Sequence, residues 1–145
     1  MSDLKDNFVK RLLSVKDSIK VKVRFDDTDA MGVVHFKNYL IYLDDGFVAF
    51  MNQIENPVEI AVVKEGIVFP VKKIDIVYEN FAKFGDYIIV NTQIKEVGKS
   101  SITFLHQMYR KSDNALLAKV ECIRLIMNLQ TKELLNAQKF LTKYV

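Results

Sequence analysis

Cysteine, proline and glycine are scarce in this chain of 145 residues, which contains one, two and five of them. The single cysteine, Cys122, excludes an internal disulfide and any site built from several cysteines, and this is typical of a reducing compartment. A low proline content, together with 50% hydrophobic and 27% charged residues, excludes a disordered chain. We therefore expect a single folded domain over residues 1–145, without a linker.

Long apolar runs are also lacking, since no stretch approaches the roughly 20 residues that a membrane-spanning helix requires. The N-terminus carries Asp3, Lys5 and Asp6 where a signal peptide would need apolar residues. We expect a cytoplasmic protein with no membrane partner. The formal charge of +3 is mild and comes from lysines scattered among many acids, so we expect no nucleic-acid partner. A small molecule bearing phosphate would suit this charge equally well.

The spacing of apolar residues predicts an α+β domain. Residues 1–17 form an N-terminal extension that could be helical, because Leu4, Phe8 and Leu12 recur at helical spacing. Residues 19–25 alternate apolar and basic side chains, as a half-buried strand does. Residues 38–53 are apolar around almost the whole circumference of a helix, and this pattern is typical of a buried helix.

The second half reads as four strands, at 67–79, 87–97, 101–111 and 116–128, separated by turn formers. Connections this short make the neighbouring strands antiparallel. A change in apolar parity predicts a bulge near Cys122. The sheet would curl around the helix, and its open edges favour pairing with a second copy, so we expect a homodimer or homotetramer.

Between the first strand and the helix lies an acidic run that contains a glycine, Asp26-Asp27-Thr28-Asp29-Ala30-Met31-Gly32. A carboxylate placed just before a helix start lies next to unpaired backbone N–H groups, which can hold an anion. Such an arrangement suits acyl transfer.

The segment Asp27-Thr28-Asp29-Ala30-Met31-Gly32-Val33-Val34, followed by Asn38-Tyr39, resembles the signature of acyl-CoA thioesterases of the 4-hydroxybenzoyl-CoA thioesterase type. That family has the hotdog fold, an antiparallel five-stranded sheet wrapped around a central helix. The resemblance implies hydrolysis of an acyl-CoA thioester to the free acid and CoA. It implies no cofactor, since coenzyme A is part of the substrate.

The resemblance also implies roles for residues of this motif. Asp29 would be the catalytic carboxylate, and it is the aspartate of the cluster nearest to the helix start, although aspartates there also commonly cap or turn the chain. Phe36 would supply a backbone N–H to the thioester carbonyl. Gly32 would allow a sharp turn or close approach of the thioester, or would be an ordinary loop glycine.

Five further residues are expected to contact the substrate: Val33, His35, Tyr39, Lys99 and Ser100. We expect Tyr39 at the pocket wall and His35 to be held by a hydrogen bond, without acting as a base. Lys99 and Ser100, at a strand turn, could meet the phosphates of CoA, and the alternative is a solvated hairpin turn. Two distant histidines and no cysteine pair predict no metal site.

Two mechanisms and a second function stay open at this level. Asp29 could attack the thioester carbonyl itself or activate a water molecule that does so. Alternatively, the domain could be a non-catalytic module that binds acyl-CoA, because one fold hosts several functions.

Overall fold

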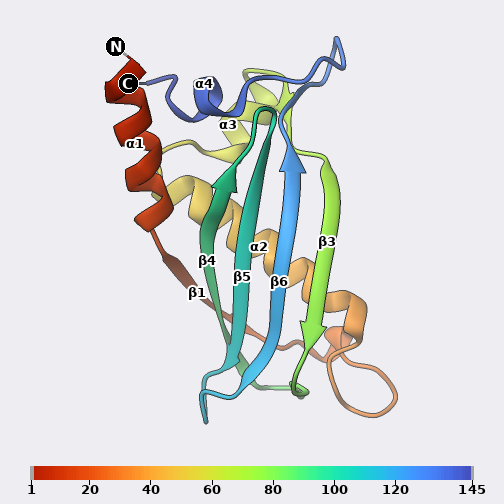
Figure 1. Ribbon diagram of the computed structural model, residues 1–145. Coiled ribbons are helices and arrows are strands. Elements are labelled where there is room, and N and C mark those ends of the chain that lie inside the picture. Colours follow the sequence, from red (N-terminus) through yellow and green to blue (C-terminus); the bar gives the residue numbers. More distant parts are fainter. Residues whose placement is uncertain (1, 145) are drawn as a thin grey trace.

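The structure is a computed structural model that describes residues 2–144. Its framework is a five-stranded antiparallel sheet with strand order β1-β4-β5-β6-β3, and one long helix, α2, packs across one face (Figure 1). The strands are β1 (Asp17–Lys22), β3 (Val71–Tyr78), β4 (Tyr87–Val97), β5 (Ser101–Arg110) and β6 (Leu116–Leu125), and the helix α2 spans Tyr39–Gln53. The expected α+β class, with an antiparallel sheet around a central helix, is confirmed.

Shorter elements complete the fold. Two 3-10 turns, η1 (Phe25–Asp27) and η2 (Phe36–Asn38), lie between β1 and α2, and η2 leads directly into α2. The helices α1 (Ser2–Ser14), α3 (Val58–Val63) and α4 (Ala137–Leu141) gather at the upper end of the sheet in Figure 1. The helix α1 packs on β4 and α4, and its Leu12 belongs to the upper part of the core, with Phe8 packed against it. The sequence pattern missed α4, which has only five residues.

Two of the predicted strands are shorter than expected. The prediction for 67–79 is wrong at Pro70, because β2 (Ile67–Val68) pairs with β7 (Met127–Asn128) in a separate two-stranded sheet and β3 begins only at Val71. Proline has no N–H to donate to a strand ladder, so the chain changes sheets there. The predicted strand 116–128 divides in the same way after Leu125.

The bulge predicted near Cys122 lies on the neighbouring strand and not on β6 itself. Along β6, Val120, Cys122 and Arg124 all stay on the buried face, but the pairing of β3 with β6 shifts between Val71 and Lys73, opposite Arg124 and Ile123. The pairing of β5 with β6 also shifts, between Met108 and Tyr109, opposite the extra residue Leu117. Ile123 and Leu125, two of the apolar residues that suggested a change of parity, are half-buried on the outer face of the sheet.

The helix α2 approaches the sheet most closely at Gly46. A Cβ atom at this position would lie 2.7 Å from the Thr92 hydroxyl oxygen and 3.0 Å from a Val90 methyl carbon. Below Gly46 lies a buried polar pair, in which Thr92 Oγ1 and His106 Nδ1 are 2.9 Å apart. Nothing among residues 2–144 bonds His106 Nε2. The core therefore contains one uncharged polar pair at the point of closest approach.

The prediction that α2 is buried on all sides is only partly right. Its residues Leu43, Phe47 and Phe50 are buried against the sheet, whereas Leu40 and Ile41 are exposed on the opposite side. Among the described helices, none is both long enough and apolar enough to cross a membrane.

The buried imidazole makes folding sensitive to acid. Burial, followed by the charge of Arg124, lowers the pKa of His106 from 6.5 to about 3. Between these two values the unfolded chain binds a proton that the folded protein does not, so the free energy of unfolding decreases as the pH falls. We expect wild type to lose about 2 kcal/mol more than His106→Gln between pH 7 and pH 5. Urea unfolding of both proteins at the two pH values measures this, and equal pH dependence would contradict it.

Candidate active site

Asp29 opens a tight turn. Its carbonyl accepts a hydrogen bond from the Gly32 amide at 2.9 Å, and its own amide donates to the Val33 carbonyl at 2.9 Å. Gly32 has φ +78°, while open space surrounds the position that its Cβ would occupy. This combination is a type I turn followed by a left-handed residue, for which aspartate and glycine are favoured. Of the two possibilities for Gly32, the structure shows the sharp turn.

The Asp29 side chain supports the turn with only one of its two carboxylate oxygens. Its Oδ1 accepts a hydrogen bond from the Met31 amide at 2.8 Å, and this supports the turn-forming alternative. No further hydrogen bond to this carboxylate is found among residues 2–144. The side chain is half-buried, and one carboxylate oxygen is available to a ligand.

Asp27, two residues earlier, is a structural residue. Its carboxylate is 2% exposed and accepts hydrogen bonds from the Arg24 guanidinium and the Tyr42 hydroxyl, both at 2.9 Å. The Asp27 carbonyl accepts from the Asn38 side chain at 2.8 Å and from the His35 amide at 2.9 Å. These bonds fasten the acidic loop to the first turns of α2. No local pattern in the sequence indicates this network.

The hydrogen bonds decide the charge of this buried carboxylate. Burial alone would raise the pKa of Asp27, but the hydrogen bonds from Arg24 and Tyr42 outweigh burial and lower it below its usual value. Burial, together with the hydrogen bond to Asp27, raises the pKa of Tyr42. Asp27 is therefore an anion at neutral pH and Tyr42 a neutral donor, so neither is free for catalysis.

The helical segment begins at Phe36. Its amide makes no hydrogen bond within the part of the chain that the structure describes, as is common for the first N–H of a helix. His35 caps the turn, with Nδ1 accepting from the Lys37 amide at 3.3 Å, and its ring stacks on Phe36. From the far side the Tyr78 hydroxyl donates to the Phe36 carbonyl at 2.9 Å. The expected hydrogen bond of His35 is present, and its expected contact with substrate stays a prediction.

A hollow of about 310 Å³ lies beside this helix start, and we call it the Asp29 hollow. Its walls are mostly apolar and come from the turn, from α2 and from the end of β3. The lining residues are Asp29, Met31, Val33, Val34, Phe36, Tyr39, Tyr78, Asn80 and Phe81. Val33 and Tyr39 are thus at the wall, and their expected contact with substrate stays a prediction. Tyr78, Asn80 and Phe81 were missed, because only the topology of the sheet brings the end of β3 here.

A second hollow lies on the other side of the turn and has a volume of about 530 Å³. We call it the Phe84 hollow; it is lined by Phe25, Asp26, Thr28, Asp29, Ala30, Gly32 and Phe84. The Phe25 and Phe84 rings meet edge to face, with centroids 5.6 Å apart. Asp29 borders both hollows, so a ligand in either one can reach its carboxylate.

Lys99 and Ser100 are far from this cluster within the chain. They form the turn between β4 and β5 at the upper end of the sheet, whereas the acidic loop lies at the lower end (Figure 1). The Lys99 carbonyl accepts from the Ala137 amide at 2.8 Å, which ties this turn to α4. The structure therefore brings together Asp29, Gly32, Val33, Phe36 and Tyr39 but not Lys99 or Ser100.

The arrangement has the parts needed for acyl transfer. A carboxylate and an amide at a helix start border the same apolar hollow, and among residues 2–144 one oxygen of the carboxylate and the amide N–H have no hydrogen-bond partner. The carboxylate can attack or deprotonate, and the amide can stabilise an oxyanion. Within residues 2–144, no group of three or more histidine, cysteine, aspartate or glutamate side chains is placed to hold a metal ion.

Comparisons with known proteins agree with this geometry. Residues 23–144 match the model of the thioesterase-like superfamily. The chain is 29% identical over 113 residues to the acyl-CoA thioesterase YbgC of Haemophilus influenzae, a match that covers 74% of this chain and 81% of that protein. A hypothetical protein from Thermus thermophilus superposes with a TM-score of 0.79 at 25% identity, covering 89% of this chain and 97% of that chain.

The structure of 4-hydroxybenzoyl-CoA thioesterase from Pseudomonas sp. strain CBS-3 superposes with a TM-score of 0.79 at 22% identity. This match covers 90% of the present chain and 99% of the other, and it confirms the hotdog fold. The chain belongs to the thioesterase-like superfamily.

Proposed function

We propose that this protein is a cytoplasmic thioester hydrolase that converts acyl-CoA to a free acid and CoA. The observation that carries the proposal is that Asp29 and the unpaired Phe36 amide border one apolar hollow at the start of α2. The name of the Haemophilus influenzae relative, an acyl-CoA thioesterase, supports it.

The free oxygen of Asp29 acts on the thioester carbonyl. It either attacks the carbon to form a mixed anhydride, which water then opens, or takes a proton from a water molecule that attacks. In both routes the carbonyl oxygen becomes an oxyanion that the Phe36 amide stabilises, and the C–S bond then breaks to release the CoA thiolate. Hydrolysis in ¹⁸O-labelled water over one turnover separates the routes, because label in the Asp29 carboxylate requires the anhydride.

The acyl group occupies the Asp29 hollow. Phe36, Tyr39, Tyr78 and Phe81 supply aromatic surface there, and the only ionisable carboxylate among its lining residues is Asp29 itself. Such walls favour an apolar acyl group over a charged one. A thiol-release assay over short, long and aromatic acyl-CoAs tests the function. Binding of all of them without release of thiol would instead favour the acyl-CoA-binding module.

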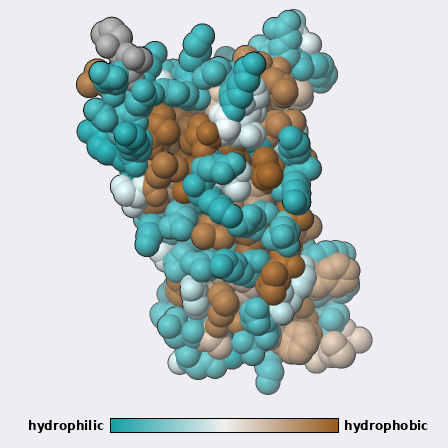
Figure 2. Space-filling model, viewed as in Figure 1, coloured by the Kyte–Doolittle hydropathy of each residue, from teal (hydrophilic) through white to brown (hydrophobic). Residues whose placement is uncertain are grey.

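The active protein is a homodimer, or a homotetramer built from dimers. Exposed apolar side chains gather around the candidate site at one lower corner of the molecule, the corner patch (Figure 2). Its members are Phe25, Met31, Phe36, Tyr78, Phe81 and Phe84, with exposed fractions from 44% to 76%. The free edge of β3 lies next to it. An apolar patch beside an unpaired strand edge favours association with a second copy.

Replacing Asp29 by asparagine tests the catalytic assignment. The amide oxygen of Asn can still accept from the Met31 amide, so the turn should persist, but the nucleophilic or basic oxygen is lost. We expect kcat to fall more than about a hundredfold, with the free energy of unfolding changed by less than about 0.5 kcal/mol. Steady-state kinetics and urea unfolding measure the two quantities.

Asp27→Asn is the matched control for this substitution. It removes the charge that Arg24 and Tyr42 bind, so we expect a loss of about 1.5–3 kcal/mol in stability. The folded fraction should keep most of its turnover. Near-normal turnover in Asp29→Asn, or a larger catalytic loss in Asp27→Asn, would reject the assignment of the two roles.

Phe36 allows the backbone amide to be removed by a side-chain substitution. Proline is tolerated at the first position of a helix, and His35 before it is extended, with φ −63° and ψ 137°, as a residue preceding proline must be. We expect Phe36→Pro to lower kcat about 10²- to 10³-fold. Phe36→Ala keeps the N–H, and its kcat should stay much closer to wild type. Equal kcat for the two variants would exclude the amide as the oxyanion donor.

Sedimentation velocity tests the oligomer. We expect a mass of two or four times 16.8 kDa for the wild type. Val77→Lys places a charge on the exposed side of β3 and should weaken association, because burying an unpaired charge is costly. The equally drastic Val63→Lys lies on α3 at the other end of the molecule and should not weaken it. A wild-type protein that sediments as a monomer would contradict the proposal.

A further inference from the structure

Three lysines converge on Tyr87 at the lower end of the sheet. The Nζ atoms of Lys20, Lys22 and Lys111 lie 5.0, 5.6 and 5.9 Å from the centroid of the Tyr87 ring. Two of them come from β1 and the third from the turn after β5. Tyr87 itself is 40% exposed and all three lysines are exposed, so the ammonium groups are open to solvent. We call these four residues the lysine cluster.

Within the described part of the chain, the lysine cluster lacks a compensating anion. Across residues 2–144, none of its three lysines forms an ion pair with a carboxylate. The two nearby acids, Asp86 and Asp113, both lie beside Arg110, at 3.4 and 2.7 Å. Cation–π contact gives only about 0.5–1 kcal/mol at exposed sites, and like charges held together repel. The local field therefore attracts an anion that carries several charges.

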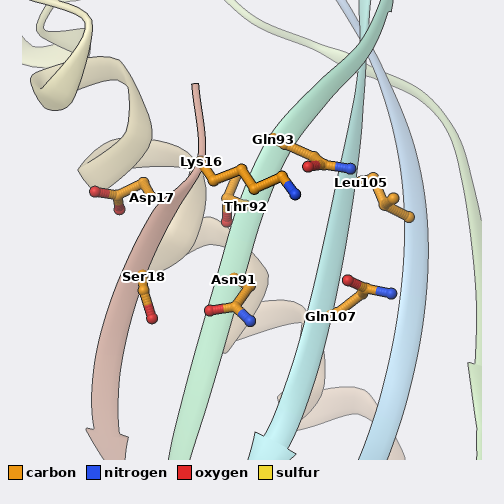
Figure 3. A pocket seen from close by; sticks show the side chains of 8 residues that line it. All are labelled: Lys16, Asp17, Ser18, Asn91, Thr92, Gln93, Leu105 and Gln107. Carbon is orange, nitrogen blue, oxygen red and sulfur yellow. The ribbon is translucent and has the colours of Figure 1, made fainter. Parts of the chain in front are cut away.

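The same face of the sheet carries amide side chains farther along. Lys22 pairs with Tyr87, Lys20 with Ile89 and Ser18 with Asn91, each pair about 7 Å from the next. Beyond them lies a hollow of about 270 Å³ that we call the amide hollow, lined by Lys16, Asp17, Ser18, Asn91, Thr92, Gln93, Leu105 and Gln107. Figure 3 shows Asn91, Gln93 and Gln107 projecting from the strands on the side away from α2. Asparagine and glutamine amides can match the hydrogen-bonding edge of adenine.

The lysine cluster also adjoins the candidate active site. A shallow hollow of about 270 Å³ beside it is lined by Gly85, Asp86, Tyr87, Lys111 and Ser112. Phe84, the neighbour of Gly85 in the chain, lines the Phe84 hollow, which Asp29 also borders. The connection between β3 and β4 and the acidic loop both lie at the lower end of the sheet (Figure 1). A flexible arm can therefore run from Asp29 past Phe84 to Tyr87.

We propose that the outer face of β1 and β4 is a nucleotide site, in which Lys20, Lys22 and Lys111 bind phosphate groups and the amide hollow accepts the adenine. This proposal rests on the proposed function, since the nucleotide end of an acyl-CoA is the natural ligand there. A free adenine nucleotide has the same chemistry, and the experiment separates the two sources. The site differs from the turn of Lys99 and Ser100, which lies at the opposite end of the sheet.

Calorimetric titration with CoA and with ADP tests the site without requiring hydrolysis. The triple variant Lys20→Gln/Lys22→Gln/Lys111→Gln should bind CoA at least tenfold more weakly than wild type, and the affinity should depend less on salt. The control Lys10→Gln/Lys64→Gln/Lys132→Gln removes the same charge from the other end of the molecule and should bind CoA as wild type does. If both triple variants lost the same affinity for CoA, the net charge of the protein would explain the loss, and the proposal would be overturned.

The amide hollow is tested by a ligand that lacks the base. The double variant Asn91→Ala/Gln107→Ala should lose affinity for CoA but keep its affinity for 4′-phosphopantetheine. An equal loss for both ligands would overturn the assignment of the adenine. If Lys99→Gln weakens CoA binding while the lysine-cluster variant does not, the phosphates bind at that turn and the proposal is wrong.

Competition between ADP and CoA shows whether the site holds the nucleotide end of the substrate or a free nucleotide. Displacement of CoA by ADP in the wild type identifies the site as the one that holds the substrate's nucleotide. Binding of ADP beside CoA, lost in the lysine-cluster variant, keeps the nucleotide site and assigns it to a free nucleotide. An acyl-CoA that binds here but is never hydrolysed would refute the proposed function and leave the site standing.

Discussion

The buried carboxylate of Asp27 is the constraint on which the candidate site depends. Through its side chain it holds Arg24 and Tyr42, and through its carbonyl it holds Asn38 and the His35 amide. These bonds join the end of β1, the acidic loop and the first turns of α2 into one unit. Because both the Asp29 turn and the Phe36 amide belong to that unit, a single buried anion determines how far apart they lie. The catalytic candidate can then remain half-exposed without becoming mobile.

Local patterns predicted most of the framework. The period-two alternation of β1, the helical spacing of α2 and the turn formers between β4, β5 and β6 each reflect contacts close in sequence. The predictions of strand bounds and of the bulge failed where one sequence pattern has two physical explanations. Ile123 and Leu125 suggested a bulge in β6 itself because outward-facing apolar residues look, in sequence, like a change of parity, whereas the irregular pairing lies on β3 opposite this part of β6. Pro70 marks the change of sheet, and its missing N–H was the signal that could have identified it.

The candidate site was predictable only in part, for a similar reason. Asp29, Gly32 and Phe36 lie within eight residues of one another, so a linear motif contains them. Tyr78 and Phe81 reach the same hollow from the other edge of the sheet, and no local pattern connects them to Asp29. The two aspartates of the motif look alike in sequence, and only the burial of Asp27 beside Tyr42 shows which one is structural.

Gly46 gives the sheet a direct influence on the helix start. It lies ten residues after Phe36, about 15 Å along the helical axis. Because Gly46 has no side chain, the backbone of α2 packs directly against Thr92 at this point and is held at a fixed distance from the sheet. A small rotation of α2 about Gly46 would move the start of the helical segment, where the Phe36 amide lies, by a larger distance than it moves Gly46 itself. The alignment of an oxyanion donor with its carboxylate thus depends on packing in the middle of the core, where no ligand ever comes.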